Sequence, residues 1–537
     1  MAFLQVVVWV AFFAAVDFFS TTAAGPSLAG EQQQEDAAYW NRLAKDSIKE
    51  SLRLKENNNI ARNVIMFLGD GMSIPTLVAA RIYKGQQQSK RGEEGLLFFE
   101  TFPRVALIKT YNVDRQVPDS AGTATAFLCG VKANYETIGL DATAIHGDCN
   151  TVEKAKVKSV VNWAQEAGKA TGVVTTTTIT HATPAGAYAH TPNRDWEADA
   201  DMIDGKSSGC KDIARQLIED LPGKDLNVIF GGGRGNFFPN DSVESSEGRR
   251  ADGRVLVDDW TEDKKKRNAT HKYVSSNDEL KEVDLSETEY LMGLFSKHHM
   301  DYEYIRKKDN SQPSLKDMTT AAIKVLKNNP NGFFLLVEGG RIDHAHHDGH
   351  ARRALDETLA MEEAVKASIE LTDSSDTLVI VTADHAHVMT VNGYPVRGNN
   401  ILGFADVGTD KMPFTTLMYT NGPGFNFTET GERVNLTNVN TSSWDFFSPS
   451  AVHLDSETHG GDDVAIYAQG PMAHLFHSLH EQNYVAHVMA YAACMGPYAN
   501  DCHRESVNAA SISKSIPLNL ALILQALVLI LCHTKQL

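Results

Sequence analysis

The sequence predicts an α/β protein, with a large, mostly parallel central sheet, helices on both of its faces and insertions at the surface. Five short runs of β-branched or apolar residues end abruptly in Gly, Asp, Glu or His, and helical stretches separate them. Runs that are apolar on both faces are typical of buried strands in βαβ units. The composition agrees, because 42% hydrophobic and 22% charged residues indicate an ordinary globular protein. The runs cover residues 63–71, 171–183, 226–233, 333–340 and 377–385.

Four of these runs end at side chains that can bind ligands. Asp70, His181, Glu338 and Asp384 each stand at or near the end of a run. A single carboxylate after a strand means little, because Asp is common in turns. In parallel sheets, however, ligands bind beyond the carboxyl ends of the strands, so several such residues in one sheet predict a shared site.

The N-terminal part predicts a targeting segment and then a helix. Residues 1–24 are typical of a secretory signal peptide, since an apolar run is followed by small residues. Residues 32–55 have the pattern of an amphipathic helix, and a helix packed on its own subunit is the simplest interpretation. The mature domain is expected at 25–508, with the polar stretch 390–448 as a surface insertion.

The C-terminus resembles a GPI-attachment signal. An apolar run at 516–532 follows a short polar spacer and a cluster of small residues that begins at Asn508. Cleavage would leave a lipid anchor at Asn508 or a near neighbour and remove 509–537. The alternative is one transmembrane helix, which the short run without a basic flank argues against.

Charge and cysteines limit the partners and the compartment. A net charge of −18 argues against a nucleic-acid partner, because binding to phosphate backbones depends on Lys and Arg. Of the six cysteines, Cys532 would leave with the tail, and Cys129 in its apolar context is expected to stay a buried thiol. In an oxidising compartment, the spacing favours Cys494 with Cys502, and next Cys149 with Cys210. Five sequons fit the secretory route, at Asn240, Asn268, Asn426, Asn435 and Asn440.

Three segments, 338–350, 382–387 and 456–463, combine acids and histidines at ligand spacing. In the first, Asp343 and His347 are four apart and would share one face of a helix. The second places Asp384 beside His385, and the third is centred on His459. Mixed carboxylate and imidazole ligation suits zinc, whereas all-oxygen ligation suits magnesium. The sequence contains no HExxH motif, which argues against a metallopeptidase of that type.

The segment 118–130 predicts a turn that runs into a helix with Ser120 at its N-terminus. A plain helix N-cap is one interpretation of this serine. The other is a nucleophile, because the same position attracts phosphate through backbone N–H groups and the helix dipole. Arg194 could hold two phosphate oxygens through its planar fork, although alone it would be taken for a surface ion pair.

Six motifs resemble those of the alkaline phosphatases, in order and with the expected separations. They are LGDGM, PDSAGTATA, THATPAGAYAHTPNRDW, VEGGRIDHAHH, TADHAHV and ETHGGDD, and the resemblance covers roughly residues 63–502. The animal, membrane-anchored branch is the closer match, because its members also carry an anchor signal and a His at the position of His181. The resemblance implies hydrolysis of phosphate monoesters to an alcohol and phosphate, through a phosphoserine on Ser120, at the outer face of the plasma membrane.

The resemblance also implies two zinc ions and one magnesium ion per subunit, with Arg194 stabilising the phosphate charge. The implied ligands are Asp343, His347 and His459 for one zinc, Asp384, His385 and Asp70 for the second, and Asp70, Thr183 and Glu338 for magnesium, with His181 beside it.

Calcium and the subunit partner are two further implications. Animal members usually carry calcium as well, but Ser296 and Gln312 stand where they place carboxylates. Losing two charged oxygens should weaken calcium strongly, so this metal is expected to be absent or weak. The family is usually homodimeric, with an N-terminal helix that reaches onto the partner, so residues 32–55 are a candidate interface.

Two alternatives to a phosphomonoesterase stay open. Sulfatases and related phosphodiesterases share this metal-rich fold, but the context of Ser120 lacks the Cys/Ser-x-Pro-x-Arg pattern of a sulfatase. A catalytically silent, GPI-anchored surface receptor is the second alternative, and the complete ligand set argues against it.

Overall fold

The computed structural model describes residues 35–202, 209–240, 248–428 and 430–500. The predicted signal peptide, Cys502, the anchor site Asn508 and the C-terminal apolar run lie outside these residues. Within the described ranges, none of the helices has the length and apolarity needed to cross a membrane.

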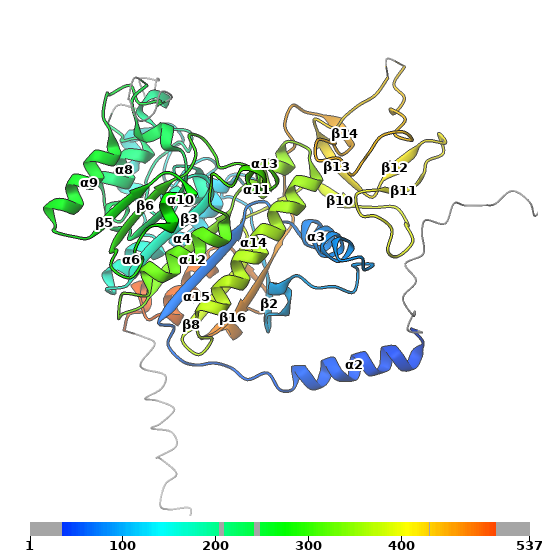
Figure 1. Ribbon diagram of the computed structural model, residues 1–537, viewed down its shortest axis with the longest axis horizontal. Coiled ribbons are helices and arrows are strands. Elements are labelled where there is room, and N and C mark those ends of the chain that lie inside the picture. The colour runs from blue at the N-terminus through cyan, green and yellow to red at the C-terminus, as the bar shows by residue number, and fades with distance from the viewer. Residues whose placement is uncertain (1–34, 203–208, 241–247, 429, 501–537) are drawn as a thin grey trace, which may run out of the picture.

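One ten-stranded sheet runs through the molecule, in the order β17-β2-β16-β8-β1-β7-β3-β4-β6-β5 (Figure 1). Every neighbouring pair is parallel except the pairs that β16 makes with β2 and β8. This confirms the predicted mostly parallel sheet. Its strands are β1 (Asn63–Gly69), β2 (Arg104–Lys109), β3 (Ala170–Thr178), β4 (Val228–Gly232), β5 (His271–Val274), β6 (Tyr290–Leu294), β7 (Phe333–Gly339), β8 (Thr377–Ala383), β16 (Val464–Gln469) and β17 (Leu479–Glu481).

The central strands are buried on both faces, because helices cover both. Every residue of β1, β3, β7 and β8 is buried, as expected for central parallel strands made mostly of apolar and β-branched residues. On one face α12 (Leu315–Leu326) and α14 (Ala351–Leu371) pack side by side, and α3 (Ile74–Gln87) packs on α14 (Figure 1). α6 (Val160–Glu166) packs on β3 and β7, and α4 and α15 pack on α6. α4 and α15 make no close contact with α12 or α14. The remaining α-helices are α2 (Ala37–Ser51), α4 (Ser120–Cys129), α5 (Val152–Ala155), α7 (Ala182–Ala185), α8 (Ile213–Glu219), α9 (Leu256–Lys266), α10 (Asn277–Lys281), α11 (Glu303–Asp309), α13 (Arg341–His347) and α15 (Tyr484–Ala492).

The expected surface insertion at 390–448 is built from small sheets beside the main one. One has the order β10-β13-β14, and β11 pairs with β12. In Figure 1 these strands form a separate lobe next to α13 and α3. Their bounds are β10 (Met389–Val391), β11 (Phe404–Val407), β12 (Pro413–Thr415), β13 (Leu417–Gly422) and β14 (Ser450–His453).

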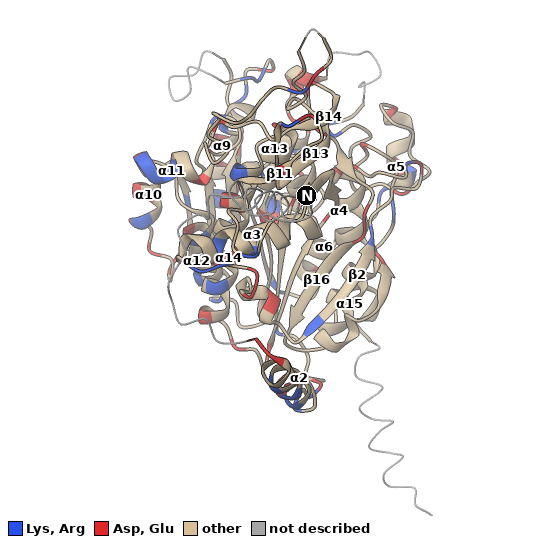
Figure 2. Ribbon diagram, turned by 90° about the vertical axis from the view of Figure 1, so that its right-hand side faces the viewer, with Lys and Arg blue, Asp and Glu red and all other residues tan. Residues whose placement is uncertain are grey.

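The helix expected near 32–55 is α2, and it stands away from the rest of the chain (Figures 1 and 2). Asp36 caps it by accepting a hydrogen bond from the backbone N–H of Tyr39, at 2.9 Å. None of its residues is buried, and Trp40 is 52% exposed. Its apolar side chains therefore have no cover within this chain.

The described cysteines include one disulfide pair and one buried thiol. Cys149 and Cys210 form a disulfide, with their Cα atoms 5.7 Å apart. Cys129 is a free, buried cysteine, as expected, and burial raises the pKa of its thiol.

Candidate active site

Four neighbouring strands bring the predicted acids and His181 to one edge of the sheet. β8, β1, β7 and β3 are adjacent, and their carboxyl ends carry Asp384, Asp70, Glu338 and His181 in that order. Two compact groups result, Asp70 with Asp384 and His385, and Asp70 with His181 and Glu338. In each group the candidate ligand atoms lie within 4.8 Å of one another. Asp70 belongs to both, so it stands between the two sites.

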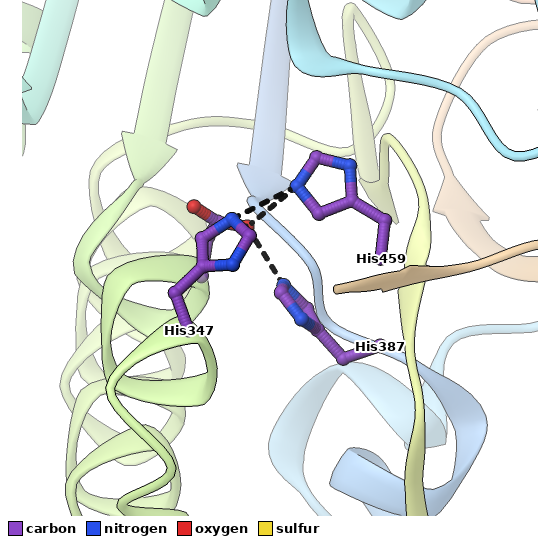
Figure 3. A group of neighbouring side chains, drawn as sticks. His347, His387 and His459 are labelled. Atoms are coloured by element: carbon purple, nitrogen blue, oxygen red, sulfur yellow. Dashed lines mark hydrogen bonds and ion pairs between the residues drawn. The ribbon is translucent and has the colours of Figure 1, made fainter. Parts of the chain in front are cut away.

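A third group forms where α13 meets a two-residue ladder. Asp343 and His347 share one face of α13, as their spacing predicted. β15 (His459–Gly460) pairs with β9 (Ala386–His387), and this register places His459 opposite His387. Asp343 Oδ1 lies 3.4 Å from Nε2 of His347 and 3.4 Å from Nε2 of His459. The Nε2 atoms of His347, His387 and His459 all lie within 3.4 Å of Asp343 Oδ1, and Figure 3 shows the three rings gathered around one point.

Backbone carbonyls fix which nitrogen of each candidate ligand is bare. The Nδ1–H groups of His347, His459 and His385 donate to the carbonyls of Glu457, Pro118 and Ala386 respectively. Nε2 of each neutral ring therefore presents a lone pair to the site. Two such lone pairs, on His347 and His459, face each other at 3.0 Å. A cation bound by both nitrogens relieves the repulsion, so the arrangement fits a metal.

The buried carboxylates point to the same conclusion. Burial, reinforced by Asp384, Asp343 and Glu338, raises the pKa of Asp70 well above its ordinary value. Burial also raises the pKa of Asp384, and it raises that of Glu338 to about 7. Burial opposes ionisation of Asp343 too, but the neighbouring histidines hold its pKa well below the ordinary value. Unpaired buried carboxylates are costly, and bound cations offset that cost.

The group around Glu338 fits a hard cation. Asp70 Oδ2, Thr183 Oγ1 and Glu338 Oε1 are buried oxygens that no hydrogen bond satisfies among the described residues. Thr183 is also one of the groups that lower the pKa of Glu338, so the two side chains are neighbours. Oxygen donors of this kind are the ligands that magnesium prefers.

His181 faces this group with a nitrogen that is not bare. Arg194 Nη2 donates to His181 Nε2 at 3.2 Å, because a guanidinium can only donate. The proton of the neutral ring is therefore on Nδ1, which has no hydrogen-bond partner among the described residues, and the residue lies in one group with Asp70 and Glu338. A protonated nitrogen cannot bind a metal, so His181 suits a role beside the metal and not as its ligand. Arg194 Nη1 also donates to Asp119 Oδ2, at 3.2 Å.

Ser120 is the first residue of α4, and Asp119 is the N-cap that precedes it. The Asp119 carboxylate accepts from the N–H groups of Ala121 and Gly122 at 3.1 and 3.2 Å. The interpretation of Ser120 as the N-cap is therefore wrong. Its hydroxyl instead faces two of the candidate metal ligands, 3.2 Å from His385 Nε2 and 3.5 Å from Asp70 Oδ1.

His387 is the residue that the sequence interpretation missed. Its Nε2 lies 2.7 Å from Asp343 Oδ1 and its Nδ1 lies 2.5 Å from Glu457 Oε2. Burial opposes a charge on this ring, yet the two carboxylates raise its pKa to about 10, so it is an imidazolium bridge and not a bare ligand. The only signal in the sequence was its place two residues after His385, within TADHAH.

A second missed cluster packs against His181. The ring centroid of His181 lies 5.5 Å from that of His299 and 5.3 Å from that of His344, and both pairs are edge to face. His299 Nδ1 accepts from the backbone N–H of Thr178, and His344 Nδ1 accepts from Arg341 Nη1 at 2.7 Å. The centroids of His299 and His344 are themselves 4.4 Å apart, so the ring of His181 packs against a pair of imidazoles whose own orientations are fixed.

This fold, with its clusters of carboxylates and imidazoles at the strand ends, fits a metal-dependent hydrolase. The comparisons with known proteins agree and are more specific. The chain belongs to the alkaline phosphatase family, whose sequence profile matches residues 61–495. It is therefore a phosphomonoester hydrolase.

The relatives are similar over nearly their whole length. The chain is 48% identical over 504 residues to the tissue-nonspecific alkaline phosphatase of Gallus gallus, covering 92% of this chain and 96% of the relative. It is 45% identical over 517 residues to the membrane-bound alkaline phosphatase of Bombyx mori, covering 93% and 92%. Among solved structures, the alkaline phosphatase of Thermus thermophilus superposes with a TM-score of 0.57 at 26% identity, covering 81% of this chain and 92% of that one.

Proposed function

We propose that Ser120 is the nucleophile of this phosphatase and forms a phosphoserine. The Ser120 oxygen attacks phosphorus, the ester P–O bond breaks, and the alcohol leaves with a proton. Water then attacks phosphorus, the Ser120–phosphorus bond breaks, and inorganic phosphate leaves. The position of Ser120 at the start of α4 carries the proposal. Its Oγ lies 3.2 Å from the bare Nε2 of His385 and 3.5 Å from Oδ1 of Asp70.

Arg194 is proposed to hold the phosphate during both displacements. Its guanidinium is fixed by Asp119 and His181, and its side chain is only 18% exposed. Although burial opposes its charge, nearby Asp119 and Asp70 raise its pKa, so it stays a cation. A fixed cation beside the serine would stabilise charge on the equatorial oxygens.

Two zinc ions and one magnesium ion are the proposed cofactors. When bound, divalent cations supply Lewis-acid stabilisation of the attacking and leaving oxygens. The bare Nε2 atoms and unpaired carboxylate oxygens described above support this donor chemistry. The proposed ligands are Asp343, His347 and His459 for one zinc, Asp384, His385 and Asp70 for the other, and Asp70, Thr183 and Glu338 for magnesium.

Hydrolysis of p-nitrophenyl phosphate at alkaline pH tests the metal dependence. Chelation is expected to abolish activity, and zinc together with magnesium is expected to restore it. A folded, fully metallated protein without activity would favour the surface-receptor alternative, or a diester or sulfate ester as the substrate.

The Ser120→Ala variant tests the nucleophile. It should lose the covalent intermediate and keep its metals, as measured by acid quench with labelled phosphate and by metal analysis. Label that remains on the variant would refute the assignment.

Calcium is proposed to be absent or weakly bound. Gln312 has its side chain engaged with Asp301, accepting from the backbone N–H at 2.9 Å and donating to Oδ2 at 3.0 Å. A neutral amide that is already paired is a poor calcium ligand. Calcium that survives dialysis beside Phe295 would overturn this, whereas its appearance only in the double variant Ser296→Glu, Gln312→Asp would support it.

A homodimer is proposed, with α2 lying on the partner subunit. The uncovered Trp40 of α2, and the 82% exposed Leu52 that directly follows the helix, support this arrangement. The Trp40→Glu, Leu43→Glu variant is expected to shift the mass toward monomer in light scattering, while Lys45→Glu on the same helix leaves it unchanged.

The outer face of the plasma membrane is the proposed location. The relative from Bombyx mori is described as membrane-bound, which supports membrane association. The proposed processing removes 1–24 and 509–537 and attaches a GPI lipid at Asn508. Release of activity from cells by phosphatidylinositol-specific phospholipase C tests the anchor. All five sequon asparagines, Asn240, Asn268, Asn426, Asn435 and Asn440, are exposed, as glycosylation would require.

A further inference from the structure

We propose that the lobe around β13 and β14 carries a binding site for a small, uncharged, apolar molecule. This lobe holds a cavity of about 640 Å³, which is within the size range of small-molecule sites. The inference is independent of the phosphatase site, because none of the proposed metal or catalytic residues lines the cavity.

Aromatic side chains outside the protein's core form a large part of the cavity wall, beside the polar residues Asn426, Asn440 and Ser443. Phe425, Phe427, Phe446 and Phe447 line it together with Met418. These side chains are part of neither buried apolar cluster in the described chain. The rings of Phe425 and Phe427 pack on each other at 4.3 Å, yet Phe427 stays 37% and Phe447 51% exposed. The wall therefore has apolar surface that a ligand could remove from water.

The charges at the cavity are already neutralised. Arg433 donates through Nε and Nη2 to the Asp410 carboxylate, at 2.9 and 2.8 Å. Asp445 accepts from Arg353 Nη2 at 2.9 Å. Both charged lining residues thus have partners outside the cavity. A ligand with a formal charge would find no partner there, which selects for an uncharged molecule.

The cavity wall is joined directly to the end of the helix that carries two proposed zinc ligands. His350 donates through Nδ1 to the carbonyl of Phe446 at 3.0 Å, and its ring packs on Phe447 at 4.3 Å. The N–H of Ser448 donates to the carbonyl of Gly349 at 2.9 Å. Gly349 and His350 follow His347 closely at the end of α13. A molecule that moves this wall would therefore also move the end of α13. Binding in the cavity should then change phosphatase activity.

Two fluorescent probes with one skeleton test the binding step. N-phenyl-1-naphthylamine is uncharged, and 8-anilino-1-naphthalenesulfonate adds a sulfonate to the same rings. With the full-length, metal-loaded protein, the uncharged probe is expected to bind saturably, one per chain. The sulfonate should bind roughly tenfold more weakly or worse, because burying an unpaired charge costs free energy. Absent saturation, or equal binding of both probes, would overturn the proposal.

Substitutions in the cavity show where the probe sits. Ala451→Trp fills the cavity from β14 and should abolish uptake, whereas Ala142→Trp, at an exposed alanine outside the cavity, should leave it unchanged. Phe425→Ala removes part of the wall and should weaken uptake severalfold. This second variant decides the question if Ala451→Trp does not fold. Uptake that survives both would place the probe elsewhere and overturn the site.

Two further measurements test whether the cavity is coupled to α13 and whether a second copy of the chain fills it. A change in kcat of the native protein that saturates together with probe fluorescence, and is lost in the Phe425→Ala variant, supports the coupling. Saturable binding with unchanged kinetics would overturn the coupling and leave the site. If a second copy of the chain fills the cavity instead, the dimer takes up no probe and Ala451→Trp lowers the mass in light scattering, which overturns the proposal.

Discussion

The Nε2 atom of His347 lies 3.0 Å from the Nε2 atom of His459, and both rings carry their protons on the far side. The Asp343 Oδ1 atom lies 3.4 Å from each of these Nε2 atoms, so its negative charge adds to the repulsion between the two lone pairs. The preference of each ring for one tautomer comes from main-chain carbonyls, so this geometry exists before a metal binds. The protein is thus arranged for a cation that the fold alone does not provide.

Metal removal should therefore destabilise the protein as well as inactivate it. A ligand that binds only the folded state adds about 4 kcal/mol when it is present at roughly a thousand times its Kd. We expect the chelated protein to unfold at a lower temperature in calorimetry and to recover with zinc and magnesium. The Ser120→Ala variant serves as the control and should show the same metal-dependent gain. An unfolding temperature indifferent to chelation would contradict the assignment.

His387 is expected to control how tightly the zinc beside Asp343 is held. The charged ring fixes Asp343 Oδ1 from one side and Glu457 from the other. His387→Gln keeps a hydrogen-bond donor but removes the charge. Loss of such a supporting contact typically lowers metal affinity about 10- to 100-fold. Competition with a chromophoric chelator measures this, and His298→Gln, at an exposed histidine, should leave the affinity unchanged.

Two substitutions distinguish the two roles of His299, which accepts a hydrogen bond from Thr178 and packs its ring on His181. His299→Phe keeps the ring but leaves the buried N–H of Thr178 unpaired, which should cost about 1–3 kcal/mol of stability. His299→Asn keeps an acceptor near the Nδ1 position but removes the ring that packs on His181.

The two His299 variants should therefore differ in what they impair. The Phe variant is expected to unfold at a lower temperature with a nearly normal KM. The Asn variant should be almost as stable as the native protein but have a raised KM, because His181 orients Arg194. Identical effects of both substitutions on stability and KM would show that His299 has only a structural role.

The sequence was sufficient to predict the strands at the centre of the sheet and to select most residues that the fold brings together in the candidate site. The segments of β1, β3, β7 and β8 are rich in apolar and β-branched residues, so composition marks them, and Asp70, Glu338 and Asp384 stand at or just after the ends of β1, β7 and β8. α13 was equally predictable, since a spacing of four puts Asp343 and His347 on one face. The outer strands β2 and β17 were not predicted. Val105 and Leu479 in them are exposed apolar residues, so neither strand has a pattern distinct from a surface segment.

The chemistry of individual histidines could not be predicted from the sequence. His459 owes its bare Nε2 to the carbonyl of Pro118, 341 residues away. His387 is charged because the fold puts it between Asp343 and Glu457, while His385, only two residues earlier, is a neutral ligand candidate. The interactions that give His387 and His459 these states are long-range, and local spacing carries no record of them.

A buried acid outside the active site should make stability depend on pH. Glu357 of α14 accepts from the backbone N–H of Glu303 at 2.5 Å, but burial raises the pKa of its carboxyl to about 8. Between its ordinary pKa and about pH 8 the folded protein binds this proton and the unfolded chain does not. Stability is therefore highest at the acidic end of that window and falls as the pH rises through it.

Glu357→Gln should remove this loss. An amide copies the protonated acid, so the variant is expected to match the native protein near pH 5 and to be more stable by a few kcal/mol at pH 9. Thermal unfolding of both proteins at these pH values measures the difference. Glu363→Gln removes an exposed carboxyl from the same helix and serves as the control. Its unfolding temperature should depend on pH as that of the native protein does. If the Glu357 variant follows the native curve at pH 9 as well, the carboxyl ionises at no cost, and a partner within the fold must stabilise its charge.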